Sequence, residues 1–207
     1  MNLYTKSVSS ELYTLLCGIM QDKGFETFIL GGGTSLALRF GHRSSIDLDF
    51  FSVPKFDSSR FLDMLREKYE NIDIVNRTPG SICAVINDYK IDFLHHPYPL
   101  ISEPAGKENI RFLSLPDIAA MKVNAVTNRG SKKDFTDLLL LHEEGIQLNM
   151  ALDFFCKKYG GGGRFLAVRS LAWFDDAEGE PDPVYLNGWS WKEVRGRVEQ
   201  LVKNIIR

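Results

Sequence analysis

The hydrophobic pattern of the chain changes its period near the middle. In the first half, short runs rich in strand-forming residues predict β-strands at residues 25–30, 46–52, 72–77, 81–87 and 89–96. Three other segments of this half have apolar residues at helical spacing, at residues 10–24, 34–40 and 56–70. In the second half, helical spacing recurs at residues 114–130, 131–145, 149–163 and 190–207, and residues 163–183 begin helical before an acidic, proline-rich loop. This order predicts an α+β fold, a mixed sheet with flanking helices followed by a helical C-terminal region.

The two halves are joined by residues 96–112, a proline-bearing loop in which we expect at most one short strand. The domain boundary should fall inside this loop. We expect a sheet domain over residues 1–110 and a helical region over residues 111–207 that completes a cleft with it.

Composition places the chain in an ordinary class of proteins. It has 207 residues, 44% of them hydrophobic and 25% charged, enough for one sizeable core or a main domain with a small appendage. The net charge of −2 argues against coating nucleic acid by bulk charge. The three cysteines have no metal-ligand spacing, and no apolar run approaches the ~20 residues that span a bilayer. The first ten residues lack the basic region and apolar run of a signal peptide. These features predict a cytoplasmic protein with reduced thiols and no membrane partner.

The stretch "ILGGGTSLALRFGHRSSIDLDFF" (residues 29–51) holds the first candidate chemistry. Neither the GxGxxG dinucleotide fingerprint nor the P-loop pattern fits, because Leu36 occupies the third glycine position and no lysine follows the glycines. Glycines before a helix nevertheless leave backbone N–H groups free at its N-terminus, where an anion is favoured. Thr34 and Ser35 add hydroxyl donors. The glycines alone favour a plain turn between a strand and a helix, because glycine turns are common.

Three aspartates give the second candidate. Strand periodicity over residues 46–52 places Asp47 and Asp49 on one face and the apolar Ile46, Leu48 and Phe50 on the other. Adjacent carboxylates repel each other unless water or a cation screens them, and hard divalent ions prefer carboxylate oxygen. If the strand that carries Asp92 is a neighbour, three carboxylates could hold two metal ions for displacement at phosphorus. Exposure of the pair on an edge strand is the alternative.

These residues resemble a known family. A glycine turn, a short helix, Asp-x-Asp on the next strand and a third acid on a later strand resemble the signature of the nucleotidyltransferase superfamily that includes DNA polymerase β. The form "GGTSLALRFGHRSSIDLDFF" followed by "KVNAVTNRGSKKDFTDL" is similar in particular to the AbiEii/AbiGii abortive-infection toxin family, over roughly residues 28–141. The resemblance implies a polymerase β-like nucleotidyltransferase fold.

The resemblance also implies roles for individual residues. Asp47, Asp49 and Asp92 would be catalytic and would bind Mg²⁺ or Mn²⁺, with Asp92 helping to deprotonate the acceptor hydroxyl. The predicted nucleotide-binding residues, with an NTP as substrate, are Gly32, Gly33, Thr34, Ser35, Arg43, Lys122, Asp134 and Asp137. Relatives of this kind act as toxins that transfer a nucleotide onto RNA, in some cases the acceptor end of tRNA, and are commonly paired with a separate antitoxin protein.

The charged residues of the helical half also have simpler interpretations. Lys122 and Arg129 fall at the margin of an apolar helix face, where their tips could reach either solvent or an anion. Lys133 and Asp137, four residues apart, could form an exposed ion pair, whereas Asp134 and Asp137 share a face that could look into a cleft.

Arg43 lies in the loop before the Asp-x-Asp strand. It suits bidentate phosphate contact, although an exposed loop arginine is equally common.

Three functions are therefore compared. The leading hypothesis is a metal-dependent nucleotidyltransferase that moves an NMP from an NTP to RNA or another acceptor, as the toxin of a toxin–antitoxin or phage-defence system. The second is a catalytically silent relative that binds a nucleotide or a partner protein. The third is an Asp-based phosphohydrolase, which fits less well because Phe50 and Phe51, and no hydroxyl residue, follow the Asp-x-Asp pair.

Overall fold

The computed structural model describes residues 3–206 and divides into two compact units. The first, here the sheet unit, holds the residues up to Arg39 together with Ser45–Pro99 and Pro104–Leu113. The second, here the helical unit, holds Phe40–Ser44, Leu100–Glu103 and the chain from Ser114 onward. The domain division at residue 110 stays a prediction.

The sheet unit is built on seven strands in the order β3-β4-β5-β2-β1-β7-β6. The strands are β1 (Phe28–Leu30), β2 (Leu48–Ser52), β3 (Ile72–Thr78), β4 (Ser81–Ile86), β5 (Tyr89–His95), β6 (Ala105–Lys107) and β7 (Ile110–Phe112). The sheet is mixed, because β2–β5 and β1–β7 pair in parallel while the remaining neighbours are antiparallel. Hairpin turns at Pro79-Gly80 and Asn87-Asp88 connect β3 to β4 and β4 to β5.

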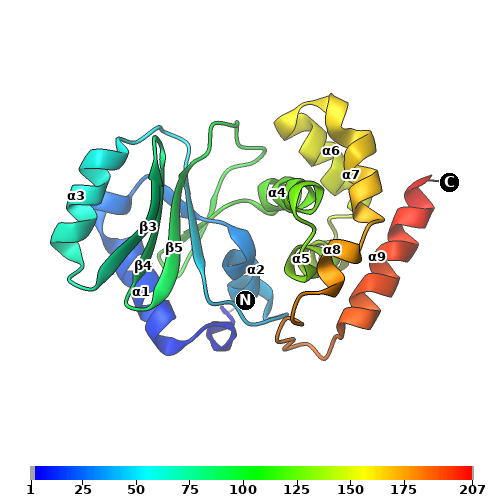
Figure 1. The fold of residues 1–207 in the computed structure, drawn as a ribbon, viewed down its shortest axis with the longest axis horizontal. Coiled ribbons are helices and arrows are strands. Elements are labelled where there is room, and N and C mark those ends of the chain that lie inside the picture. Colours follow the sequence, from blue (N-terminus) through cyan, green and yellow to red (C-terminus); the bar gives the residue numbers. More distant parts are fainter. Residues whose placement is uncertain (1–2, 207) are drawn as a thin grey trace. The chain divides into compact units, whose positions relative to one another are not determined.

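One face of the sheet packs on helices α1 (Ser10–Gln21) and α3 (Ser58–Lys68), which flank it in Figure 1. Short 3-10 turns at Thr5–Ser7 and Lys23–Phe25 bracket α1, and Ser9 and Asp57 cap the N-termini of α1 and α3. The core between helices and sheet is rich in aromatic rings, and the Phe50 and Phe93 rings of β2 and β5 stack at 5.4 Å between centroids. Because strand residues alternate, the residues between these core positions lie on the other face of the sheet.

The sheet continues further than expected at one edge. The loop over residues 96–112 was predicted to hold at most one strand, yet it forms the β6–β7 hairpin. Glu108 and Asn109 make its two-residue turn with φ of 50° and 64°, the geometry that a tight hairpin needs. The prediction was wrong because a Glu-Asn turn is not one of the usual glycine-bearing hairpin signals, and because β7 gains its place by pairing with β1.

The Asp-x-Asp segment also differs from the expectation. Strand β2 begins at Leu48, so Asp47 precedes it, and Ile46 is 62% exposed although it was expected on the apolar face. Only Leu48 and Phe50 of the three apolar residues enter the core. The alternation ends where strand pairing ends, because the register of β2 with β5 begins at Leu48.

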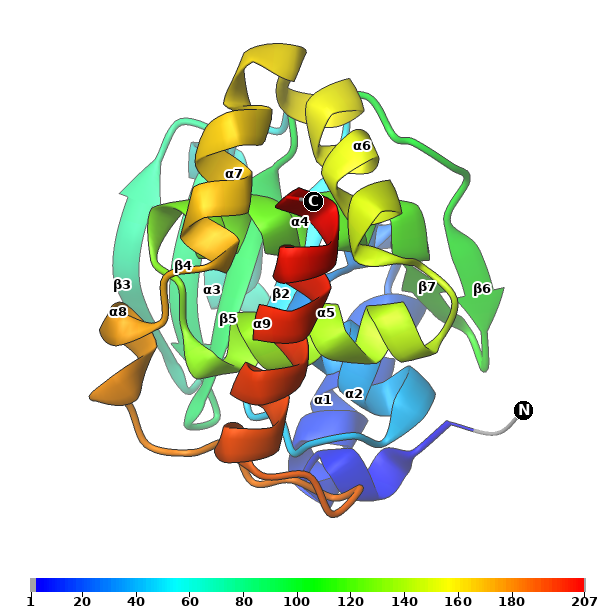
Figure 2. The same cartoon turned by 90° about the vertical axis from the view of Figure 1, so that its right-hand side faces the viewer.

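Within the described residues, the helical unit consists of six helices. Figure 2 shows these helices in a view turned by 90° from Figure 1. They are α4 (Leu115–Asn128), α5 (Lys132–Glu143), α6 (Leu148–Tyr159), α7 (Arg164–Leu171), α8 (Asp175–Glu178) and α9 (Trp191–Ile206), with a 3-10 turn at Gly161–Gly163 before α7. Helix α4 packs against α5, α6 and α7, and α9 packs against α5. No helix within residues 3–206 is long and apolar enough to cross a membrane.

Two short segments from the first half of the sequence belong to the helical unit. Residues 40–44 form a bridge between Arg43 and Tyr185, with further backbone hydrogen bonds from Ser44 N to Val184 O and from Leu186 N to His42 O. The loop that precedes Asp47 in sequence is therefore held by the chain segment before α9.

Candidate functional site

The glycine turn lies directly against the Asp49 carboxylate. Helix α2 (Gly32–Phe40) begins at Gly32, two residues earlier than expected, and Gly32 has φ of +61°. A Cβ atom built on Gly32 would lie 2.0 Å from Asp49 Oδ2, so no other residue fits without moving that carboxylate. Gly31 N donates to Asp49 O at 2.8 Å. The turn therefore has two local reasons for glycine, its backbone conformation and the close approach of an acid.

Asp49 and Asp92 are partners in the parallel register of β2 and β5. Neighbouring strands lie about 4.8 Å apart. Because side chains alternate along a strand, both carboxylates lie on the face of the sheet away from the aromatic core. The ammonium of Lys90, two residues before Asp92 and half exposed, pairs with Asp92 at 2.9 Å. Burial and a hydrogen bond to Asp92 raise the pKa of Cys83, the Asp92 partner on β4, to about 11. The face thus brings an acid pair, one cation and one protonated thiol together.

Asp47 is held by its backbone just before β2. Thr34 Oγ1 donates to Asp47 O and also lies 2.7 Å from Ser45 Oγ. The next hydroxyl, Ser35 Oγ, accepts from Arg39 Nη2 at 2.7 Å, and both Thr34 and Ser35 are buried. These two hydroxyls therefore connect α2 to the Asp47 loop and to the end of α2 itself.

The predicted metal ligands do not form a closed three-ligand cage. Among residues 3–206, no group of three or more His, Cys, Asp or Glu side chains could hold a metal ion. The register of β2 and β5 still places Asp49 next to Asp92, which is the neighbour relationship that the sequence hypothesis required.

In the helical unit, Asp137 accepts from three basic side chains. Arg43 binds it in bidentate fashion, with Nε to Oδ1 at 2.8 Å and Nη2 to Oδ2 at 2.9 Å. His42 Nε2 lies 2.8 Å from Oδ1, and Lys122 Nζ lies 2.5 Å from Oδ2. Although burial alone would raise the pKa of Asp137, Arg43 and Lys122 lower it well below its usual value. Asp137 is therefore an anion held by two cations.

Lys122 joins Asp137 to Asp134. Its ammonium lies 3.0 Å from Asp134 Oδ1, and Arg129 Nε donates to Asp134 Oδ2 at 2.8 Å. Burial lowers the pKa of Lys122, but the carboxylates of Asp137 and Asp134 more than reverse this and raise it. Burial likewise raises the pKa of Asp134, whereas Lys122 and Arg129 bring it down to about 2.

Two sequence alternatives are settled by these contacts. Arg43 is only 2% exposed, so it is not an exposed loop arginine, and Asp137 pairs with Arg43 and Lys122 instead of forming the surface pair with Lys133. Lys122 meets protein carboxylates and does not reach toward solvent. Arg43, Lys122, Asp134 and Asp137 therefore form one buried cluster, called here the ion-pair cluster.

Two partners of buried acids were missed from the sequence. His42 is buried with its Nε2 on Asp137, and burial lowers its pKa, so the imidazole is neutral near pH 7. Lys158 of α6 pairs with Asp117 of α4 at 2.6 Å, and Asp117 also accepts from the backbone N–H groups of Ile101 and Ser102. Neither position has a distinctive local signal, since His42 lies in a polar loop and Lys158 is one of two adjacent lysines.

The predicted site residues thus fall into two sets. The sheet unit brings together the glycine turn and the three acids Asp47, Asp49 and Asp92. The helical unit holds the ion-pair cluster. Their assignment to catalysis, nucleotide binding and metal binding stays a prediction.

Comparison with known proteins identifies a family and a relative of this chain. The family model of the nucleotidyl transferase AbiEii toxin, of type IV toxin–antitoxin systems, matches residues 14–91 and 84–199. A protein of Aquifex aeolicus (strain VF5), described as uncharacterized protein aq_aa25, is 35% identical over 161 residues, which cover 74% of this chain and 76% of that protein.

Two crystal structures from Helicobacter pylori share the fold. A candidate nucleotidyltransferase matches with a TM-score of 0.57 and 17% identity, covering 94% of this chain and 91% of that one. JHP933 matches with a TM-score of 0.57 and 18% identity, covering 96% and 93%.

The mixed sheet with its flanking helices is an α+β fold, which the two Helicobacter pylori structures share. The chain belongs to the AbiEii nucleotidyltransferase toxin family, which its family model matches over most of its length. The predicted fold class, family and enzyme class are confirmed.

Proposed function

We propose that the chain is a divalent-metal-dependent nucleotidyltransferase that transfers an NMP from an NTP to a hydroxyl group of RNA, with tRNA as one such acceptor. The observation that carries this proposal is the position of Asp49, which pairs in register with Asp92 and lies against the Gly32 turn at the start of α2. The Gly32 turn and the acid pair are therefore neighbours, which supports one site for both the NTP phosphates and a divalent ion. This is the combination that nucleotidyl transfer requires.

The acids fit a divalent ion even without a three-ligand cage. Mg²⁺ is usually held by one or two carboxylates together with water and substrate phosphates. Asp49 and Asp92 supply two carboxylates from adjacent strands. The Asp49 carboxylate occupies the space beside Gly32 that a Cβ atom would otherwise take. We assign Mg²⁺ or Mn²⁺ to Asp47, Asp49 and Asp92, where it would neutralise phosphate charge and polarise the acceptor hydroxyl.

The proposed reaction joins the NMP to an acceptor hydroxyl and releases pyrophosphate. An acceptor hydroxyl oxygen attacks the α-phosphorus of the NTP, the bond from that phosphorus to the β-phosphate bridging oxygen breaks, and pyrophosphate leaves. In the proposal, the Asp92 carboxylate accepts the hydroxyl proton. The ammonium of Lys90 lies 2.9 Å from Asp92, beside this proposed proton acceptor.

The glycine turn would bind the phosphates through its backbone. The N-terminus of α2 offers unpaired N–H groups and a favourable field for an anion at Gly32 and Gly33. Because Thr34 and Ser35 already bond to Ser45, Asp47 and Arg39, we assign their hydroxyls the further task of fixing the turn.

For the ion-pair cluster, nucleotide contact by Arg43, Lys122, Asp134 and Asp137 remains part of the proposal. The observed pairs support a second contribution, because they hold the segment of residues 40–44 that leads into the Asp47 loop. A nucleotide phosphate would then compete with Asp137 for the guanidinium of Arg43.

The biological setting follows from the family. The family consists of toxins of type IV toxin–antitoxin systems, which supports a toxic activity countered by a separate antitoxin. We place this activity in the cytoplasm, where RNA and NTPs are both present.

The transfer can be tested directly. Purified protein is incubated with each α-labelled NTP and total RNA, with and without Mg²⁺. Asp49→Asn tests the site, and Asp63→Asn, an exposed acid on α3, is the matched control. Labelled RNA is expected only with Mg²⁺ and only from the wild type and the control. Nucleotide binding without any transfer would indicate the silent relative.

A further inference from the structure

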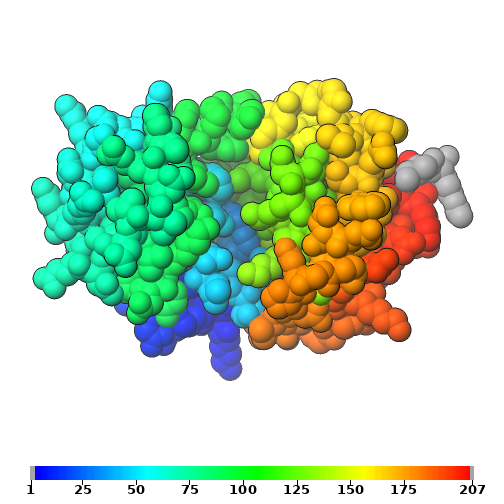
Figure 3. All heavy atoms as spheres, in the orientation of Figure 1, coloured from blue at the N-terminus to red at the C-terminus, as the bar shows by residue number. Residues whose placement is uncertain are grey.

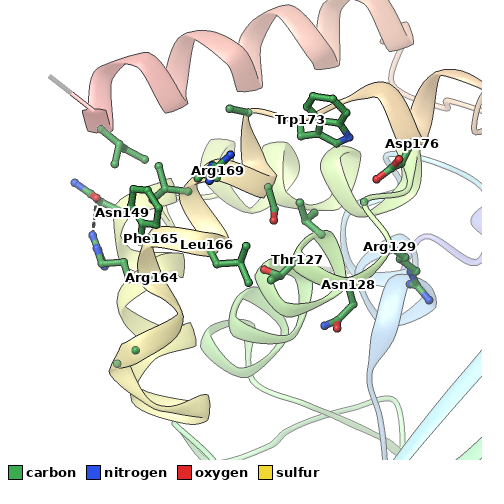
Figure 4. A pocket seen from close by; sticks show the side chains of 18 residues that line it. Thr127, Asn128, Arg129, Asn149, Arg164, Phe165, Leu166, Arg169, Trp173 and Asp176 are labelled. Carbon is green, nitrogen blue, oxygen red and sulfur yellow. Dashed lines mark hydrogen bonds between the residues drawn. The ribbon is translucent and has the colours of Figure 1, made fainter.

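A second concave surface lies within the helical unit, away from the acids of the sheet unit in sequence. It is a cavity of about 1240 Å³ between the end of α4, helix α7 and the residues that follow α7. Figure 4 shows its lining side chains, with Phe165 and Arg164 toward one end and Trp173 and Asp176 toward the other. We call this surface the α7 groove. None of the residues assigned to nucleotidyl transfer line it.

Large apolar side chains project from the wall of the α7 groove. Phe165 is 75% exposed, and Leu166 and Trp173 are each 56% exposed. They lie on the surface formed by residues 164–182, drawn amber to orange in Figure 3. Aromatic rings that stand out from a surface offer flat faces on which bases can stack. A soluble monomer rarely exposes such a group without a ligand or partner.

Cationic groups surround these rings. Arg129, Arg164 and Arg169 all line the groove, against Asp176 as the one carboxylate among the lining residues described. Arg169 has its guanidinium 5.8 Å from the centroid of Phe165, and no ion pair of Arg169 occurs within the described residues. The ligand that complements this lining is therefore anionic.

The groove also contains uncharged polar side chains and exposed glycine backbone. Asn128 and Asn149 present amides, Thr127 a hydroxyl, and Gly161 and Gly162 have no atom within 4 Å of a Cβ built on them. Amides can donate to and accept from base edges, and open glycine backbone allows a sugar-phosphate chain to approach closely. Arginine, asparagine and exposed aromatic rings together are the set that recognises unpaired nucleotides.

We infer that the α7 groove binds single-stranded nucleic acid, with bases stacked on Phe165 and Trp173 and phosphates on Arg164, Arg169 and Arg129. This goes beyond the proposed transfer chemistry, because it assigns a separate binding surface for the acceptor strand. Arg129 and Arg164 are also paired with Asp134 and Asp153, so Arg169 carries the most direct phosphate contact. An acidic apolar peptide is the competing occupant, and the test separates the two.

Binding is measured by fluorescence anisotropy with an end-labelled, mixed-sequence RNA strand of about twelve nucleotides, a length within the range of known single-strand sites. NTP and divalent ions are omitted. The variants are Phe165→Ala, Trp173→Ala and Arg169→Ala. The controls are Val75→Ala and Arg66→Ala, which remove an exposed apolar and an exposed basic side chain from the sheet unit. Thermal unfolding by circular dichroism verifies that each variant is folded.

The wild type and both controls should bind the strand equally, and added salt should weaken binding. Each groove variant should bind about tenfold more weakly, the size of effect expected for loss of one stacked base or one phosphate contact. A duplex of the same length should bind less well, because its bases cannot stack on the rings.

The inference is overturned if the wild type does not bind, if groove variants bind as the wild type does, or if strand and duplex bind alike. It is also overturned if the variants alter only the self-association of the chain or its binding of an acidic peptide. Asp49→Asn should retain wild-type affinity for the strand, so a failure of nucleotidyl transfer and a failure of this inference give different results.

Discussion

Asp49 and Asp92 face each other across the parallel pair of β2 and β5, on the side of the sheet opposite the aromatic core. Two like charges on adjacent strands lower the stability of a sheet unless a cation lies between or beside them. Lys90 pairs with Asp92 at 2.9 Å. Variants of this acid pair therefore test the proposed catalytic role and the stability of the sheet separately.

Replacing Asp49 by Asn should reduce nucleotidyl transfer by about 100-fold or more, since it removes a carboxylate proposed to bind the divalent ion that neutralises the reacting phosphates. The free energy of unfolding should stay within about 1 kcal/mol of the wild type, because one of two like charges on adjacent strands is removed. Initial rates and urea unfolding measure the two effects. A large loss of stability with little loss of rate would assign Asp49 to the fold alone.

Gly32→Ala should displace the Asp49 carboxylate. The new Cβ would lie 2.0 Å from Asp49 Oδ2, and the φ of +61° is unfavourable for alanine. We expect a strong loss of transfer together with a stability cost of about 1–2 kcal/mol. Gly18→Ala is the matched control, because a Cβ there meets nothing within 4 Å and the residue lies inside α1. The control should keep full activity, and equal activity of both variants would contradict the close approach.

Asp137→Asn should destabilise the helical unit. It leaves Arg43 and Lys122 buried without the carboxylate that both contact, and loss of one partner from a buried ion pair costs about 3–5 kcal/mol. Asp175→Asn, an exposed acid on α8, should change stability by about 0.5 kcal/mol or less. Chemical denaturation followed by circular dichroism gives both numbers. A cost for Asp137→Asn as small as that of the control would show that the cluster is not holding the unit together.

The stability of the helical unit should fall in acid in a defined window. Lys122 and Arg129 lower the pKa of Asp134 to about 2 in the folded chain, against 3.8 for the ordinary side chain. A lowered carboxyl pKa contributes stability above the unfolded value and loses it as the pH falls from about 3.8 through about 2. The difference in unfolding free energy between wild type and Asp134→Asn should therefore be constant near neutral pH and shrink below about pH 4. A difference that stays constant down to pH 3 would contradict the ion-pair assignment.

The sequence predicted the class of fold because that class depends on local pattern. Alternating apolar residues define β2, β4 and β5, and hairpins connect β3, β4 and β5 in order. The pairing of the Asp-x-Asp strand with the strand of Asp92 was only a condition of the three-acid hypothesis, because β2 and β5 are distant in sequence, and the structure meets that condition. The alternation was expected to include Asp47, but strand pairing begins only at Leu48. Local pattern could not show this, because the point where pairing stops depends on the neighbouring strand.

The ion-pair cluster could not be predicted in the same way. Arg43 and Asp137 are 94 residues apart, and no local pattern reveals that their side chains meet. The sequence did show a cation at the margin of an apolar face at Lys122, but both solvent and an anion satisfied that pattern. The β6–β7 hairpin was missed for a related reason, since its short strands depend on pairing with β1.

The central claim is that a nucleotide, and not a phosphate, is transferred. Parallel reactions with Mg²⁺ and RNA should use one NTP labelled at the α-phosphate and the same NTP labelled at the γ-phosphate. We predict that wild-type protein transfers the α-label to RNA and releases the γ-label as pyrophosphate, and that Asp49→Asn does neither. Release of labelled inorganic phosphate without labelled RNA, or transfer of the γ-label, would contradict the account and support the phosphohydrolase or another phosphoryl transferase.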